Sequence, residues 1–259
     1  VPAMVGVSSA YYLVHSMAAG TGYHERDLDA ARHFAAAARD GGVSRIIFLG
    51  GLAEEGRELS DHLRSRQETG AALRSAGVPV TEFRASVIVG SGSISFEMVR
   101  YLTERLPAMI CPRWIYTRTQ PIGIRDVLAY LTAALTVEDS RGRVVEIGGA
   151  DVLDYGGMMR TYAEVRGLRR LIIPVPVLTP RLSSYWVNVV TPITAAIARP
   201  LIEGLRNDSI VRDPAAAELF PDIRPAGYRV SVSRALAQLS ASEVETAWSD
   251  ALSTSAGPA

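Results

Sequence analysis

Two side chains with complementary chemistry stand four residues apart in the segment that follows residues 45–51. His62 can exchange a proton near neutral pH, whereas Arg66 is a permanent cation that presents a planar fork of N–H donors. Ser65 lies between them in the sequence. A spacing of four residues puts His62 and Arg66 on one face of a helix. The pair therefore suits proton transfer beside an anchored polar ligand.

Both residues also have a purely structural interpretation. His62 is then a surface residue near a helix N-cap at Ser60 or Asp61. Arg66 then makes a salt link to Glu68 or another solvated contact. The residues alone leave the functional and the structural interpretation open.

The elements around this pair predict a parallel sheet. Residues 45–49 are apolar and β-prone, and Gly50-Gly51 allows a sharp turn before a helix that is expected from about Ser60 to Ser75. Further strands are expected at 11–14 and 80–89, with a helix at 27–40. Alternating strands and helices are typical of an α/β fold, in which ligands bind at the carboxyl ends of the strands.

The second half of the chain predicts a smaller substrate region. Helices are expected at 95–105 and 124–135, followed by a strand at 144–147. After residue 150 the composition shifts toward Pro, aromatic and apolar residues. We therefore expect a domain over 1–150 and a mainly helical substrate or lid region over 151–259. Short helices broken by prolines are expected within 178–205, where Tyr185-Trp186 suit core packing, an apolar pocket or a membrane surface.

Composition narrows the class of protein. The chain has 259 residues, 48% of them hydrophobic, which is enough for a sizeable core. Lys plus Arg and Asp plus Glu number 27 each, so no net charge favours nucleic acid as a partner. The lone Cys111 excludes an internal disulfide and fits a reducing, cytoplasmic location. No metal-ligand spacing, signal peptide or membrane-spanning run is present, and a peripheral membrane contact stays open.

Several blocks of the sequence carry a family resemblance. No G-x-G-x-x-G motif occurs, since Gly20-Thr21-Gly22 and Gly90-Ser91-Gly92 both lack the third glycine. The blocks AYYLVHSM, GVSRIIFLGGL, LRSRQETGAALRSAGVPVTEFRASVIVGSGS, QPIGIRDV and VVEIGGADVL resemble atypical short-chain dehydrogenases/reductases, close to NmrA-like NAD(P)H-binding proteins. The similarity covers most of 8–160. It implies a Rossmann-type doubly wound sheet that begins near its fourth strand, without the amino-terminal glycine-rich loop.

The resemblance implies where a cofactor would lie. Residues His15, Ser16 and Met17 match the loop along the cofactor, and Leu49, Gly50 and Gly51 match the strand end beside the nicotinamide. The next strand brings Arg84, Ala85 and Ser86 to the same pocket, with its floor at Ser86 and Gly90 to Gly92. The family's Tyr-x-x-x-Lys positions are His62 and Arg66, here a possible acid/base and a ribose anchor.

Two functions follow from this resemblance. The first is an NAD(P)H-dependent reductase, dehydrogenase or epimerase that acts on a moderately bulky, partly apolar small molecule. The second is a non-catalytic NAD(P)-sensing regulator or an assembly protein, similar to NmrA-like regulators or to the accessory subunit of respiratory complex I. Loss of the tyrosine and lysine favours the second. Neither the NAD versus NADP preference nor the oligomeric state follows from the sequence.

Overall fold

The centre of the molecule is a four-stranded, wholly parallel sheet. The computed structural model of the chain describes residues 2–14, 23–53, 59–175, 202–204 and 207–240. Within them the strand order of this sheet is β1-β2-β3-β8. Its strands are β1 (Ser9–Tyr12), β2 (Arg45–Gly51), β3 (Val80–Ala85) and β8 (Val144–Ile147). Ile46, Ile47 and Phe48 are fully buried, as expected for a parallel strand covered on both faces.

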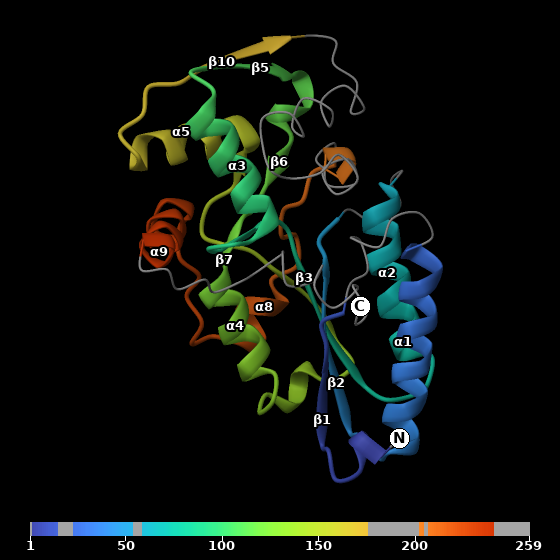
Figure 1. Ribbon diagram of the computed structural model, residues 1–259. Helices are drawn as coiled ribbons and strands as arrows, with labels where there is room; N and C mark the ends of the chain where they lie inside the picture. Colours follow the sequence, from blue (N-terminus) through green and yellow to red (C-terminus); the bar gives the residue numbers. More distant parts are fainter. Residues whose placement is uncertain (1, 15–22, 54–58, 176–201, 205–206, 241–259) are drawn as a thin grey trace.

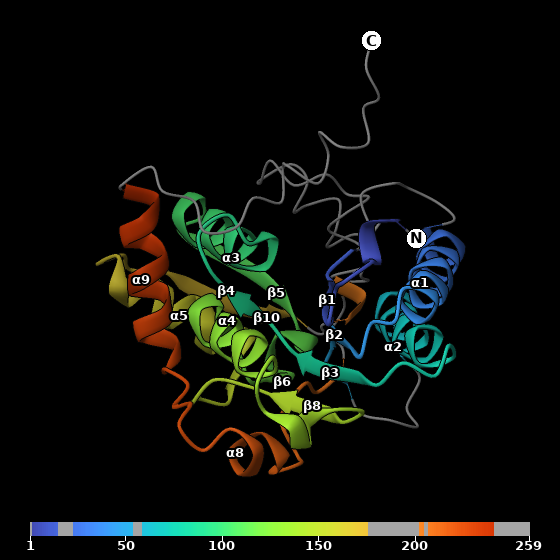
Figure 2. The same ribbon diagram turned by 90° about the horizontal axis from the view of Figure 1, so that it is seen from below.

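Helices cover both faces of this sheet (Figures 1 and 2). On one side lie α1 (Tyr23–Asp40) and α2 (Asp61–Arg74), and on the other lie α4 (Ile124–Ala133) and the short α8 (Ala215–Leu219). The buried alanines Ala31, Ala35 and Ala38 share one side of α1 and let it pack closely. The predicted α/β fold with a parallel sheet is therefore confirmed.

A second cluster of elements lies beyond the carboxyl ends of the sheet strands. It contains α3 (Ile94–Arg105), α5 (Tyr155–Val165) and α9 (Tyr228–Ser240), whose buried side chains form one apolar core. Three two-stranded sheets accompany these helices. They pair β4 (Ile88–Val89) with β7 (Ile122–Gly123), β5 (Ala108–Pro112) with β10 (Leu171–Val175), and β6 (Arg118–Thr119) with β9 (Leu153–Asp154).

The core of this second cluster mixes segments from both sides of residue 150. Phe96 of α3 meets Tyr162 of α5 edge-on, with ring centroids 5.9 Å apart. The single turns η1 (Pro2–Met4), η3 (Arg113–Tyr116) and η4 (Glu138–Ser140) complete the described elements. The domain boundary at residue 150 stays a prediction. Of the segment 178–205, where proline-limited short helices are expected, only residues 202–204 are described, and they are helical.

Two strands differ from the sequence prediction. The strand expected at 11–14 is shifted, since β1 spans Ser9–Tyr12. Beyond its end, the carbonyl of Val14 accepts a hydrogen bond from Arg66. The single strand expected at 80–89 is split, since β3 ends at Ala85 and β4 pairs with β7 in another sheet. The hydroxyl of Ser86 binds side chains outside the central sheet at this break.

The region after residue 150 contains more strand than expected. Besides α5, α8 and α9, it supplies β9 and β10. Both strands pair with residues before 150, so their partners are distant in sequence and invisible to local pattern analysis. Among the described residues, no helix is long and apolar enough to cross a membrane.

Candidate functional site

Arg66 joins the carboxyl ends of two neighbouring strands. It lies on α2, which begins after an N-cap at Ser60 whose hydroxyl accepts a hydrogen bond from the Leu63 amide at 3.3 Å. Its Nη1 donates to the Val14 carbonyl, just beyond β1, at 3.3 Å, and its Nη2 donates to the Leu49 carbonyl of β2 at 2.5 Å. A planar guanidinium suits this role because its donors diverge toward two acceptors.

The environment of Arg66 is buried and charged. Only 8% of the residue is exposed, and its guanidinium carbon lies 4.8 Å from the ring centroid of Phe48. Burial lowers the pKa of Arg66, while the nearby Asp27, Tyr12 and Glu82 act in the opposite direction. Burial and Asp27 raise the pKa of the Tyr12 phenol, and Arg66 opposes them. The carboxyl end of the sheet therefore contains a buried cation close to the carboxylates of Asp27 and Glu82.

Glu82 forms a second buried charged centre on the same side of the sheet. Its carboxylate is paired with Arg74 of α2, and its Oε1 accepts from Arg84 Nε at 2.8 Å. Glu82 and Arg84 are two residues apart on β3, so they share one face of the strand. A Cβ at Gly70 would lie 2.4 Å from Glu82 Oε2, which shows how closely α2 approaches. Glycine at position 70 makes room for this carboxylate.

His62 lies in the first turn of α2, four residues before Arg66, and is partly exposed. It stands at the amino end of the helix, where backbone N–H groups and the helix dipole favour negatively charged ligands. Ser65, by contrast, is fully buried. Glu68, the partner considered for Arg66, instead pairs with His24 at 2.8 Å.

The strand ends predicted to border a cofactor lie side by side. In the register of β2 and β3, Gly50 pairs with Arg84 and Gly51 pairs with Ala85. A Cβ at Gly51 would lie 3.0 Å from Leu63 Cδ2, so this glycine lets α2 pack close to the strand end. The structure therefore brings together Leu49, Gly50, Gly51, Arg66, Arg84 and Ala85.

Ser86 belongs to a different polar cluster. Its hydroxyl lies 2.5 Å from Thr119 Oγ1 and 2.7 Å from Ser209 Oγ, and Ser209 Oγ donates to Thr119 Oγ1 at 3.1 Å. Tyr155 also hydrogen bonds Thr119, and burial raises the pKa of its phenol. Hydroxyls of Thr119, Tyr155 and Ser209, which are distant in sequence, therefore join Ser86 in one cluster where the chain leaves β3.

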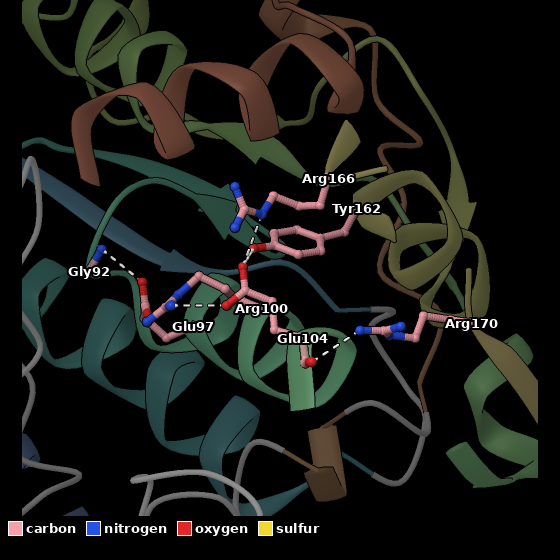
Figure 3. Close-up of polar contacts among 7 residues, drawn as sticks. All are labelled: Gly92, Glu97, Arg100, Glu104, Tyr162, Arg166 and Arg170. Carbon is pink, nitrogen blue, oxygen red and sulfur yellow. Dashed lines mark hydrogen bonds and ion pairs between the residues drawn. The ribbon is translucent and has the colours of Figure 1, made fainter. Parts of the chain in front are cut away.

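The predicted pocket floor at Gly90 to Gly92 is held by α3. Gly92 has a φ of +75°, which favours glycine, and its amide donates to Glu97 Oε1 at 3.4 Å. Glu97 is 4% exposed, and its other oxygen accepts two hydrogen bonds from Arg100 (Figure 3). A buried carboxylate that is paired in this way fixes the loop relative to the helix.

The same network continues from α3 to α5 (Figure 3). Glu104 Oε1 accepts from the Tyr162 hydroxyl at 2.6 Å and from Arg166 Nε at 3.1 Å. Arg170 Nη2 donates to the Glu104 carbonyl at 3.1 Å. Burial raises the pKa of Tyr162, and Glu104 adds to that effect. These contacts hold α3 against α5 and so position the Gly90 to Gly92 loop.

Five candidate residues belong to segments that the structure does not describe. His15, Ser16 and Met17, with Tyr185 and Trp186, are outside the described residues. In the part of the chain that the structure describes, no group of three or more His, Cys, Asp or Glu side chains could hold a metal ion.

Sequence reasoning missed Tyr12, Asp27 and Glu82, which surround Arg66 electrostatically. A usable signal was present in the strand Val80–Ala85, where Glu82 and Arg84 alternate with apolar residues. Opposite charges two residues apart, on one face of a strand that is otherwise buried, indicate a paired internal cluster.

Comparison with known proteins identifies the fold. None of the protein-family models matches the chain, and no curated protein matches it. A nucleoside-diphosphate-sugar epimerase from Staphylococcus aureus matches with a TM-score of 0.68 at 16% identity, over 89% of this chain and 78% of that protein. An NADPH-dependent quinone oxidoreductase from Escherichia coli, in complex with NADPH, matches with a TM-score of 0.70 at 16% identity, over 91% and 78%.

A third solved structure agrees with these two. The Citrobacter sp. triphenylmethane reductase in complex with NADP(H) matches with a TM-score of 0.64 at 18% identity, over 90% of this chain and 78% of that protein. At such identities the likeness concerns the fold and not the chemistry. The predicted Rossmann-type fold is therefore confirmed.

Proposed function

We propose that the chain binds NAD(P)H at the carboxyl ends of β1, β2 and β3 and acts as an oxidoreductase or epimerase on a small, partly apolar molecule. One observation carries this proposal. In a Rossmann-type fold, Arg66 places a buried cation between the ends of two adjacent strands. Ligands of open α/β sheets bind outside such strand ends. Three solved structures of the same fold have NADPH, NADP(H) or NAD in their complexes.

The described residues at this edge fit a dinucleotide. A dinucleotide has ribose hydroxyls and an anionic pyrophosphate, and both are complemented by a fixed guanidinium and by the amino end of a helix. Arg66 would hold the ribose hydroxyls. Leu49 to Gly51 and Arg84 to Ser86 would border the nicotinamide, and His15 to Met17 would run along the cofactor. Gly90 to Gly92 would form the floor of the pocket.

His62 is the proposed acid/base. The dinucleotide supplies hydride chemistry when it is bound, and the protein supplies placement and a proton. Histidine is suited to proton transfer because its usual pKa lies near neutrality. His62 stands one helical turn from Arg66 and the residue is partly exposed, but its Nδ1 is buried. Nε2 is therefore the nitrogen assigned to proton transfer.

The test combines binding with turnover. The full-length protein is titrated with NADPH and with NADH by calorimetry, and carbonyl reduction is then measured on a panel of aldehydes, ketones and quinones. We expect His62→Ala to bind the dinucleotide like the wild type and to lose at least about a hundredfold in kcat, the usual size of a general-acid contribution. His33→Ala is the matched control, since His33 is an exposed histidine on α1. Equal turnover in His62→Ala and wild type would remove His62 from the mechanism.

A second candidate function is a non-catalytic NAD(P)-sensing or assembly protein. The hydrogen bonds of Arg66 favour this candidate, because both terminal nitrogens already donate to backbone carbonyls, those of Val14 and Leu49. Arginine also does not release a proton as lysine can in the family's proton relay. Tight dinucleotide binding without turnover on the carbonyl panel would favour this candidate over the enzyme.

A further inference from the structure

The small parallel sheet of β5 and β10 has one apolar face open to solvent. Ile110, Leu171 and Ile173 are 60%, 59% and 40% exposed, whereas Met109 and Cys111 between them in the pleat are buried in the core of α3 and α5. Leu171 pairs with Ala108 and Ile173 pairs with Ile110, so these residues share the outer face. Figure 1 shows both strands at the end of the molecule that lies farthest from the N-terminus.

Such a face is unusual for parallel strands. Parallel sheets are normally covered on both faces, and a two-stranded sheet is only marginally stable by itself. An open face of isoleucine and leucine therefore indicates a surface that meets another apolar phase.

Strand addition to a second copy is disfavoured. Pro112 lies in β5 and Pro174 lies in β10, and proline cannot donate a ladder hydrogen bond. Prolines in edge strands blunt the pairing of one sheet with another. The face of this sheet, and not its edge, is therefore what the molecule offers to a partner.

The two segments that form this face are rich in arginine, although acidic residues, Glu104 and Glu164, directly precede them. Residues 105–118 and 165–175 contain three arginines each and no Asp or Glu, although the whole chain has equal numbers of basic and acidic residues. Some of these arginines have partners, since Arg118 pairs with Asp208 and Arg166 with Glu104. Arg105, whose guanidinium carbon lies 4.8 Å from the Tyr101 ring centroid, and Arg169 are also exposed, and each lies just before one of the two strands.

These two arginines stand at the same end of the sheet. The Leu171 amide donates to the Pro107 carbonyl at 3.0 Å, which places the amino ends of β5 and β10 side by side. The result is an aliphatic face with cationic side chains along one border. Apolar area beside basic residues matches the boundary between acyl chains and anionic headgroups.

We propose that the outer face of β5 and β10 docks on an anionic lipid surface. Ile110, Leu171 and Ile173 enter the acyl boundary, while Arg105 and Arg169 contact headgroup phosphates. This docking is independent of dinucleotide binding, since the face lies on β5 and β10 and the proposed cofactor site at the ends of β1, β2 and β3.

Vesicle co-sedimentation tests the proposal. The full-length protein should pellet with vesicles of mixed phosphatidylcholine and phosphatidylglycerol, less so at high salt, and should stay in solution with phosphatidylcholine alone. Replacing Ile110 and Leu171 by Ser should weaken partition by at least about tenfold, because two aliphatic side chains no longer leave water. Arg105→Gln and Arg169→Gln should each weaken it roughly fivefold.

Matched controls are available elsewhere on the surface. Leu128→Ser replaces an aliphatic residue of α4 that is 51% exposed, and Arg32→Gln replaces an exposed arginine of α1. Both should pellet like the wild type. The proposal would be overturned if the wild type did not pellet with the phosphatidylglycerol-containing vesicles. Equal pelleting of the face variants and the controls would also overturn it. Self-association that is lost in the Ile110 and Leu171 variant, without vesicle binding, would assign the face to a second copy of the chain and also overturn it.

Discussion

Replacing Arg66 by alanine should destabilise the protein more than any substitution of an exposed arginine. The side chain is 8% exposed and holds the carbonyls of Val14 and Leu49 at the ends of two strands. Its removal leaves both carbonyls without this donor. It also removes a cation from the neighbourhood of the buried Asp27 and Glu82, although Glu82 keeps its pairs with Arg74 and Arg84.

The size of the effect follows from these contacts. Hydrogen bonds from a charged donor contribute about 1.5 to 3 kcal/mol each, and the relief of Arg66 desolvation offsets part of their loss. Removal of one partner from a buried charged cluster typically costs about 3 to 5 kcal/mol. We therefore expect Arg66→Ala to lower the free energy of unfolding by about 3 to 5 kcal/mol. Arg66→Lys keeps the charge but loses the fork, and should cost about 1 to 2 kcal/mol.

Urea unfolding followed by circular dichroism measures these differences. The control is Arg64→Ala on the same helix, where the Arg64 side chain is 54% exposed and pairs with Asp61 at the surface. That change should stay within about 0.5 kcal/mol of the wild type. If Arg66→Ala also fell within about 1 kcal/mol of the wild type, Arg66 would not join the strand ends as its contacts indicate.

The remaining predictions concern Glu82, Cys111 and Ser86. Glu82→Gln should cost about 3 kcal/mol in urea unfolding, because Arg74 and Arg84 lose a shared carboxylate, whereas the exposed Glu164→Gln should change stability little. Burial raises the pKa of Cys111 to about 11, so at pH 8 the native thiol should react with a disulfide reagent far more slowly than in urea; a native rate equal to that of free cysteine would contradict this. Because the folded state raises this pKa, the neutral thiol contributes to the free energy of unfolding below pH 9, and this contribution should be lost as the pH rises through 11. The Cys111→Ala variant should not show that pH-dependent loss of stability. Ser86→Ala should cost about 1 to 2 kcal/mol by opening the hydroxyl cluster with Thr119 and Ser209, and an unchanged urea midpoint would refute that role.

The central fold was predictable from the sequence because its signals are local. Strands such as 45–49 and 144–147 are short apolar runs bounded by glycine or polar residues, and the helices between them have caps and an apolar face. Of the small strands, only β4 fell within a predicted strand, 80–89, and there it was joined to β3. The strands β5, β6, β7, β9 and β10 pair with strands distant in sequence, and two-residue strands such as β6, β7 and β9 have no periodicity to detect.

The candidate site was predictable only in part. The resemblance located Leu49 to Gly51 and Arg84 to Ser86 at adjacent strand ends and Arg66 on the helix beside them, and all but Ser86 lie together. What the sequence did not indicate was the direction of each side chain. Arg66 points beneath the strand ends to two carbonyls, and Ser86 points to Thr119 and Ser209. These directions depend on helix packing against the sheet, which one chain's local pattern does not encode.

Arginine at position 66 provides a cation that is fixed in place, which a lysine at this position would not. A lysine ammonium is a point charge on a flexible stem, whereas the guanidinium fork is planar and holds two carbonyls on neighbouring strands. The cation is therefore fixed by the protein before any ligand arrives. A ligand that contacts it meets an ordered group and does not have to immobilise a mobile side chain. Under the proposed function, Arg66→Lys should therefore weaken NADPH binding measured by calorimetry, in addition to its cost of about 1 to 2 kcal/mol in the free energy of unfolding. Proton transfer at this site would then be assigned to His62 alone.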